Sequence, residues 1–311
     1  MALHRSSGRW QLGLGLAALT ACLWGMLPLL LDITLQALDP ITITWFRFVV
    51  AFSVLGTWLG LRGEWPQRRH LTRSLVVQLA IATVFLGANY LAFLVGLDMT
   101  SAGTAEVVIQ LAPLLLALGG LVVYGEHYTL RQWTGLGVLL AGMAWFLLDT
   151  VGVTTIEPQN YWLGSAIVVL AAVLWVVYAL LQKQLLSKLS SSQIMLVLYG
   201  GCSVMYSFGA QPAALLEQTT VQWMALLACA ANTLVAYGAF AESLNHWEAS
   251  RISAIIALTP ILTLVFVDLA AWVWPEQVAV EAMSRWGWTA ACIVVCGSWI
   301  VVLGRRYSPN Q

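Results

Sequence analysis

Two ionisable side chains, Arg47 and Glu106, lie inside long apolar runs of the sequence. A charge is costly to place in a bilayer, so such residues are usually paired or functional. We expect Arg47 and Glu106 either to pair with each other or to contact a solute. In the second case Arg47 would hold a carboxylate, and Glu106 would hold an ammonium group or carry a proton. The structural alternative is that both side chains extend to the membrane interface, about two helical turns away.

A second group combines amides, phenol hydroxyls and indoles at positions predicted to lie within the membrane. Such side chains either line a polar cavity or join helices through hydrogen bonds worth about 1 kcal/mol each. Because they are concentrated in a few apolar runs, we expect a central cavity with aromatic walls, suited to aromatic or cationic ligands. The candidate substrate-binding residues are Trp24, Asn89, Tyr90, Gln110, Trp175, Tyr178, Asn232 and Tyr237.

Three prolines, Pro28, Pro113 and Pro260, interrupt apolar runs. Proline has no amide donor, so the carbonyl group four residues earlier loses its helical partner and must be satisfied by a neighbour, water or ligand. For Pro113 and Pro260 these carbonyls belong to Ile109 and Ile256. We predict that the three prolines are pivots of moving helices. The alternative is a kink that only serves packing.

The sequence lacks the patterns of common catalytic and metal-binding sites. It contains no G-x-S-x-G, no H-E-x-x-H and no phosphate-binding glycine loop. The five cysteines fall inside apolar runs without metal-ligand spacing. The formal net charge of zero gives no electrostatic basis for nucleic-acid binding. We therefore predict no enzymatic activity, no cofactor, no metal and no nucleic-acid partner.

The elements that carry these residues are predicted to be membrane-spanning helices, with the lipid bilayer as their surroundings. Hydrophobic residues make up 60% of the 311-residue chain and charged residues 9%, whereas about a quarter of a soluble protein is charged. A helix needs about 20 apolar residues to cross the hydrocarbon core. Ten runs of suitable length are Trp10–Leu31, Pro40–Leu61, Leu75–Leu97, Gly103–Tyr124, Gln132–Leu148, Tyr161–Leu181, Gln193–Gln211, Val221–Ser243, Ser250–Trp274 and Trp286–Gly304.

Internal matches indicate that the chain is a duplication. Most of residues 87–126 recurs 147 positions later, and the first and sixth runs match at an offset of 151. The predicted repeats are residues 1–150 and 151–311, each with five spans. An odd number of spans inverts the second repeat in the membrane, which permits alternating access to a central site. The matching pairs include Gly13/Gly164, Trp24/Trp175, Tyr90/Tyr237 and Pro113/Pro260.

Basic residues predict the orientation of the chain. With the amino terminus in the cytoplasm, the cytoplasmic loops collect nearly all of the arginines and lysines, and the other side keeps Arg285. The positive-inside rule therefore places both termini in the cytoplasm. The sequence thus predicts an all-α integral membrane transporter, with two five-helix inverted repeats around a central cavity.

Several motifs resemble the EamA branch of the drug/metabolite transporter superfamily over nearly the whole chain. They are Leu23–Gly25, Pro113 followed by Gly125 and Glu126, the R-Q-W-x-G-x-G-V-L-L-A-G stretch Arg131–Gly142, and Pro260 followed by Glu276. The second repeat departs from the pattern, with Pro275 where the first has Gly125. This resemblance implies a transporter with its fifth and tenth spans at the periphery.

Within that superfamily the chain most resembles the YddG-type aromatic amino acid exporters of bacterial inner membranes. The resemblance implies export of amino acids from cytoplasm to periplasm, with aromatic ones preferred and a range that extends to threonine, methionine, lysine, glutamate and aromatic cations. Two alternatives stay open: efflux of drugs or metabolites such as methyl viologen or nucleobases, and a non-transporting membrane scaffold. We expect a monomer or a weak homodimer.

Overall fold

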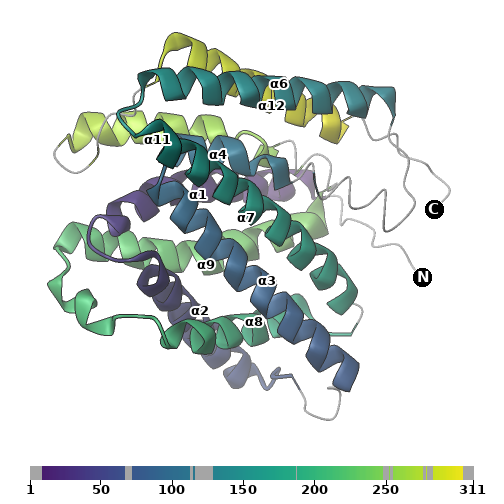
Figure 1. The fold of residues 1–311 in the computed structure, drawn as a ribbon. Coiled ribbons are helices and arrows are strands. Elements are labelled where there is room, and N and C mark those ends of the chain that lie inside the picture. The colour runs from purple at the N-terminus through teal and green to yellow at the C-terminus, as the bar shows by residue number, and fades with distance from the viewer. Residues whose placement is uncertain are drawn as a thin grey trace.

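The protein is a bundle of helices, seen in a computed structural model (Figure 1). The structure describes residues 9–66, 72–112, 115, 129–186, 188–247, 252, 255–275, 278 and 283–303. Its helices are α1 (Trp10–Leu35), α2 (Pro40–Arg62), α3 (Arg73–Asp98), α4 (Ala102–Ile109), α6 (Leu130–Val153), α7 (Pro158–Leu185), α8 (Ser191–Ser207), the 3-10 helix η2 (Pro212–Glu217), α9 (Thr220–His246), α11 (Thr259–Val273) and α12 (Arg285–Leu303).

Within the described ranges, α1, α2, α3, α6, α7 and α9 are the six helices long and apolar enough to cross a membrane, and α11 and α12 are shorter apolar helices. All eight lie on predicted spans. α4 covers only the start of the predicted span Gly103–Tyr124, because most of the remainder lies outside the described residues. The predicted span Ser250–Trp274 does not contain one continuous helix, since Ala257 and Leu258 form a turn before α11 begins. The chain is an all-helical membrane protein.

Helix starts follow from short polar sequences that satisfy the first backbone amides. Asp39 accepts hydrogen bonds from the amides of Ile41 and Thr42 at 2.9 and 3.0 Å, and Pro40 occupies the first turn of α2. Three other helices, α6, α8 and α9, begin with a capping box, in which a threonine or serine and a glutamine three positions later bond to each other's backbone amides. These caps satisfy amides that the first turn of a helix leaves without a helical partner.

α8 ends earlier than the sequence predicted. It stops at Ser207, four residues before the predicted end at Gln211. The carbonyl of Tyr206 there accepts the amides of both Gly209 and Ala210, and η2 begins at Pro212. Proline cannot continue the hydrogen-bond ladder of the preceding helix, so the chain turns at this point.

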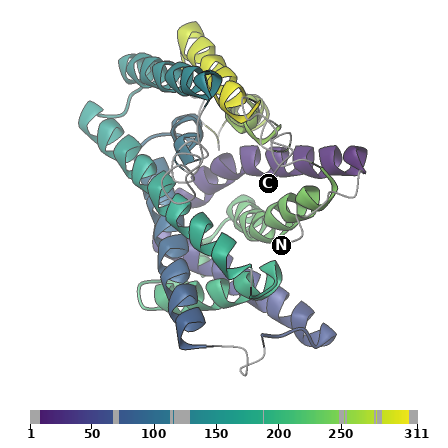
Figure 2. The ribbon, with the colours of Figure 1, turned by 90° about the vertical axis from the view of Figure 1, so that its right-hand side faces the viewer.

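The main helix pairs of the bundle recur when the two halves of the chain are exchanged. The pairs α2 with α8, α4 with α11 and α6 with α12 each join equivalent helices of the two halves. The pair α3 with α7 has α9 with α1 as its counterpart. α6 and α12 lie side by side at one edge of the bundle in both views (Figures 1 and 2). This is the packing expected of a duplicated chain with its fifth and tenth spans at the periphery.

Two matched glycines make equivalent contacts in the two halves. A Cβ atom on Gly13 in α1 would lie 2.5 Å from the Cβ of Trp247, the residue that ends α9. A Cβ atom on Gly164 in α7 would lie 2.7 Å from the Cβ of Met99, the residue that ends α3. In each half, the start of the first helix therefore packs closely on the end of the other half's third helix.

We expect Gly164→Ala to lower the stability of the purified protein, because its Cβ would overlap Met99 and Thr100. Overpacking of this kind costs about 1–3 kcal/mol, and thermal unfolding in detergent measures it. Gly15→Ala is the control, since Gly15 is also helical and a Cβ there meets nothing within 4 Å. Equal melting temperatures for the two variants would contradict the close contact.

Candidate functional site

Arg47 reaches from α2 into the interior of the bundle, where its side chain is 3% exposed. Its Nε atom donates a hydrogen bond to Thr233 Oγ1 on α9 at 3.2 Å. Its guanidinium carbon lies 4.9 Å from the centre of the Tyr90 ring on α3, within the range of a cation–π interaction. The guanidinium is thus enclosed by three helices and does not extend to the outer surface.

The charge on Arg47 has no acidic partner among the described residues. No described carboxylate lies within 4.0 Å of the guanidinium, so Arg47 and Glu106 do not form an ion pair. Within the same residues, the terminal nitrogens make no hydrogen bond, and neither of them is fully enclosed by protein. A planar guanidinium with free donors is well suited to bind a carboxylate through two parallel hydrogen bonds.

The two aromatic pairs found in the sequence repeat come together beside Arg47. The hydroxyl of Tyr237 lies beside both the hydroxyl of Tyr90 and the indole of Trp175, where hydrogen bonds can form. The rings of Trp24 and Tyr237 are 5.4 Å apart at an interplanar angle of 67°. Each half contributes one tryptophan and one tyrosine, so both halves build this cluster. We call Arg47, Trp24, Tyr90, Trp175 and Tyr237 the central cluster.

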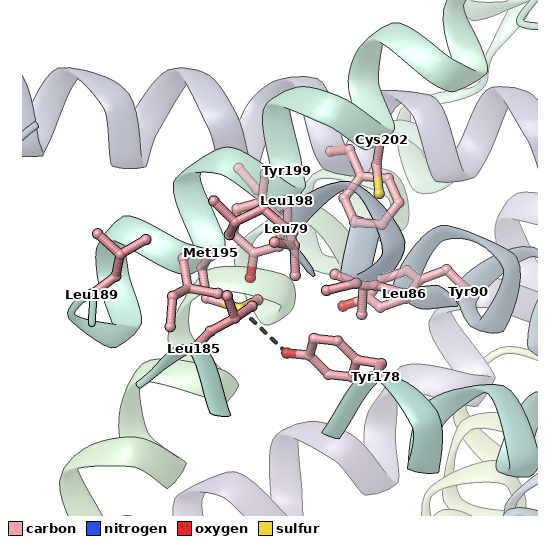
Figure 3. Packing of buried hydrophobic residues seen from close by; sticks show 14 of the residues in the cluster. Leu79, Leu86, Tyr90, Tyr178, Leu185, Leu189, Met195, Leu198, Tyr199 and Cys202 are labelled. Carbon is pink, nitrogen blue, oxygen red and sulfur yellow. Dashed lines mark hydrogen bonds between the residues drawn. The ribbon is translucent and has the colours of Figure 1, made fainter. Parts of the chain in front are cut away.

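Tyr178, another predicted residue, lies in the adjoining hydrophobic core. Its hydroxyl is 3.4 Å from the sulfur of Met195 on α8 (Figure 3). Figure 3 also shows Tyr199 and Tyr90 in this core. Tyr199 donates to the carbonyl of Thr233 at 3.2 Å and so helps to fix the residue that holds Arg47.

Sequence reasoning did not select Thr233 or Tyr199 for the site. Thr233 is 1% exposed and bonds both to Arg47 and to the carbonyl of Cys229. A threonine in an apolar helix gives no distinctive pattern, because its hydroxyl can bond within its own helix. Tyr199 did carry a signal, since it is a tyrosine within an apolar run like the tyrosines that were selected.

Asn89 and Asn232 hold helices together. Asn89 Nδ2 on α3 donates to the carbonyl of Ala171 on α7 at 2.8 Å. Asn232 Nδ2 on α9 donates to the carbonyl of Leu23 on α1. The two bonds therefore join α3 to α7 and α9 to α1, which are equivalent helix pairs in the two halves of the chain. Both amides thus have the geometry of the interhelical alternative, at positions next to the central cluster, since Asn89 directly precedes Tyr90.

A second polar group forms where α4 meets α11. Glu106, 7% exposed, lies beside Thr259, and Gln110 Nε2 donates to Thr259 Oγ1 at 3.1 Å. The Thr259 hydroxyl is 2.6 Å from the carbonyl of Ile256 and donates to it. That carbonyl precedes Pro260 by four residues, so Thr259 supplies the hydrogen bond that proline cannot.

The three predicted pivots differ in their surroundings. Pro260 lies in the first turn of α11, directly after the turn at Ala257 and Leu258. Pro28 is buried inside α1, which continues through it from Trp10 to Leu35. Pro113 lies outside the described residues. Among the described residues, no group of three histidine, cysteine, aspartate or glutamate side chains is placed to hold a metal ion.

We expect Asn89→Ala to destabilise the protein by about 1 kcal/mol, because the variant loses a hydrogen bond between two helices. Thermal unfolding in detergent measures the change, and Asn160→Ala, at an exposed position of α7, is the control. If Asn89→Ala instead melted like the control and only weakened solute binding, the amide would be a solute contact.

Comparison with known proteins shows which protein family this chain matches. The model of the EamA-like transporter family matches residues 11–148 and 162–303. A protein of Escherichia coli K12 named uncharacterized inner membrane transporter YhbE is 33% identical over 95% of this chain and 93% of its own length. An uncharacterized transporter of Haemophilus influenzae is 30% identical over 96% of this chain and 97% of its own length.

Two further comparisons are more distant. A probable amino-acid metabolite efflux pump of Escherichia coli K12 is 22% identical over 94% of this chain and 95% of its own length. One crystal structure matches with a TM-score of 0.64 at 18% identity, over 95% of this chain and 99% of that chain. The structural match supports the fold alone.

Proposed function

The chain belongs to the EamA-like transporter family, and on that premise we propose that it exports amino acids, aromatic ones in preference, from the cytoplasm to the periplasm. It is a multi-pass membrane transporter and not an enzyme. The proposal includes ten spans in two inverted repeats, residues 1–150 and 151–311, with both termini in the cytoplasm. The solute would be exposed alternately to the two sides of the inner membrane.

The observation that carries this proposal is the central cluster. It combines one buried cation with an aromatic group to which both halves contribute. Matched residues of two repeats that meet at one place are what alternating access requires, since either half can then move relative to the bound solute. Indole and phenol rings favour an aromatic side chain through edge-to-face and stacked contacts.

Arg47 favours a solute with a carboxylate. Its positive charge is buried without an acidic partner among the described residues, and an unpaired buried charge is unfavourable. A carboxylate bound to its free nitrogens would supply the missing negative charge. An aromatic amino acid has both groups that the cluster can recognise, a carboxylate and a ring.

The relatives support the transport class more strongly than the substrate. The relatives of Escherichia coli and Haemophilus influenzae at 30% identity or more are named as uncharacterized transporters, and the relative named as a probable amino-acid metabolite efflux pump is 22% identical. The link to YddG-type exporters is correspondingly distant. The amino acid proposal therefore rests mainly on Arg47 and the rings around it.

Efflux of aromatic cations such as methyl viologen is the second candidate. The rings of Trp24, Tyr90, Trp175 and Tyr237 favour it, because aromatic faces attract cations. Arg47 disfavours it, since a cationic solute in the same cluster would meet an uncompensated positive charge. Competition between the two kinds of solute distinguishes these candidates.

Counterflow in proteoliposomes tests the proposal. Vesicles are loaded with unlabelled phenylalanine, labelled phenylalanine is added outside, and tryptophan, threonine, lysine, glutamate and methyl viologen are compared as competitors. We expect saturable accumulation that tryptophan blocks strongly and methyl viologen weakly. No accumulation by correctly inserted protein would remove phenylalanine as a substrate, and a block by methyl viologen alone would favour cation efflux.

We expect Arg47→Lys to raise the KM for phenylalanine by about tenfold, equivalent to about 1.4 kcal/mol, because lysine keeps the charge but cannot form two parallel hydrogen bonds. Inhibition by the amine phenethylamine, which has no carboxylate, should not change. Arg62→Lys is the matched control, since Arg62 also lies on α2 and over an aromatic ring, that of Trp58, at 4.1 Å. Equal losses for acid and amine would contradict carboxylate binding.

A further inference from the structure

The break before α11 leaves one carbonyl group that depends on a side chain. Pro260 has no amide hydrogen, so the carbonyl of Ile256 has no donor from the helix at that position. The Thr259 hydroxyl donates to it at 2.6 Å. Because this group is inside a membrane-spanning protein, losing that donor would leave a polar oxygen without water to replace it.

Thr259 has a single hydroxyl proton and three polar neighbours. A hydroxyl donates one hydrogen bond and accepts two. If it donates to the Ile256 carbonyl, it must accept from the other two, Gln110 and Glu106. The Gln110 amide is a donor in either case. Glu106 can be a donor only when its carboxyl group is protonated.

We propose that Glu106 is the proton-binding group of the transporter and that Thr259 links its protonation to the helix break before α11. The proposal rests on the transport function proposed above, to which it adds the source of energy. With the proton bound, Glu106 donates to Thr259, and Thr259 donates to the Ile256 carbonyl. When the proton leaves to solution, the Thr259 hydroxyl turns to the carboxylate and the Ile256 carbonyl loses its donor.

The surroundings of Glu106 contain no charge that could replace the proton. α4 packs against α1, α3, α6, α7 and α11. Neither a basic nor an acidic side chain of the described residues interacts with Glu106. α7 adds the uncharged hydroxyl of Tyr161, 3.4 Å from Thr104 on α4. The described charged residues of these helices are Asp32, Arg73, Asp98, Arg131, Asp149 and Asp268.

Direct contacts join this proton site to the central cluster. The Thr263 hydroxyl, one turn after Thr259, donates to the carbonyl of Gly25 on α1 at 2.7 Å and is 3.1 Å from the carbonyl of Thr259. Gly25 permits this approach, since a Cβ there would lie 2.8 Å from the Cβ of Leu262. Its neighbour Trp24 packs on Tyr237. A rearrangement of the break before α11 therefore acts on a helix that contributes to the central cluster.

Infrared spectroscopy of the full-length protein tests the proton site without any solute. The difference between the wild type and Glu106→Gln isolates the carboxyl group of Glu106. At neutral pH we expect the band of a protonated carboxyl group in the wild type and its loss in the variant. The band of an ionised carboxylate at neutral pH would overturn the proposal, whether or not phenylalanine is transported.

Transport assays test the link through Thr259. In vesicles with an acidic interior, we expect the wild type to accumulate labelled phenylalanine as protons leave. In Glu106→Gln and Thr259→Val we expect the accumulated phenylalanine to be about tenfold lower than in the wild type. Both variants should still show counterflow when there is no pH gradient. Thr259→Ser keeps the hydroxyl and should behave like the wild type.

The outcomes separate the proton site from the proposed function. Full pH-driven accumulation by Glu106→Gln would overturn the proton site and leave amino acid transport intact. Normal accumulation by Thr259→Val would overturn the link to the helix break. If the wild type showed no phenylalanine counterflow, the substrate proposal would fail, and the infrared difference would still decide whether Glu106 holds a proton.

Discussion

The need to find partners for polar groups buried inside the protein shapes much of this structure, although five buried side-chain oxygens of the described residues, such as those of Thr44 and Ser298, have none. Hydrocarbon gives no hydrogen bonds, so each amide, carbonyl and hydroxyl at membrane depth needs a partner from the chain. At the span ends, capping boxes satisfy the first backbone amides of α6, α8 and α9. Where Pro260 interrupts the backbone hydrogen bonds of the helix, the Thr259 hydroxyl supplies the missing donor. Between α3 and α7, the side-chain amide of Asn89 finds its partner in the backbone carbonyl of Ala171.

The same requirement distinguishes polar groups that the fold satisfies from the cation of the proposed site. Asn89 and Asn232 donate to backbone carbonyls of neighbouring helices, and these bonds join the two halves. Arg47 instead leaves its terminal nitrogens without partners among the described residues. A site can be recognised by donors whose partners the fold does not supply, because a solute can then complete the set.

Much of this arrangement could be predicted from the sequence, and the remainder depended on side-chain directions. The repeat predicted the pairs Trp24/Trp175 and Tyr90/Tyr237, and an internal duplication must place matched residues about a common axis. The polarity of Asn89 was visible too, but whether an amide faces a cavity or a neighbouring helix depends on packing. Thr259 was missed because nothing in its local sequence shows that a carboxyl group from α4 lies beside it.

Gly13 and Gly164 make chemically similar contacts at equivalent points of the two halves. In the proposed inverted arrangement, these points lie at opposite membrane faces. Both contacts are formed in this structure, so opening towards either face would break one of two similar contacts, and the packing energy lost is of similar size in the two cases. In the proposed alternating cycle, the difference between Trp247 and Met99 would then bias which face opens more readily. A modest preference of the solute for one orientation is then sufficient to redistribute the molecules.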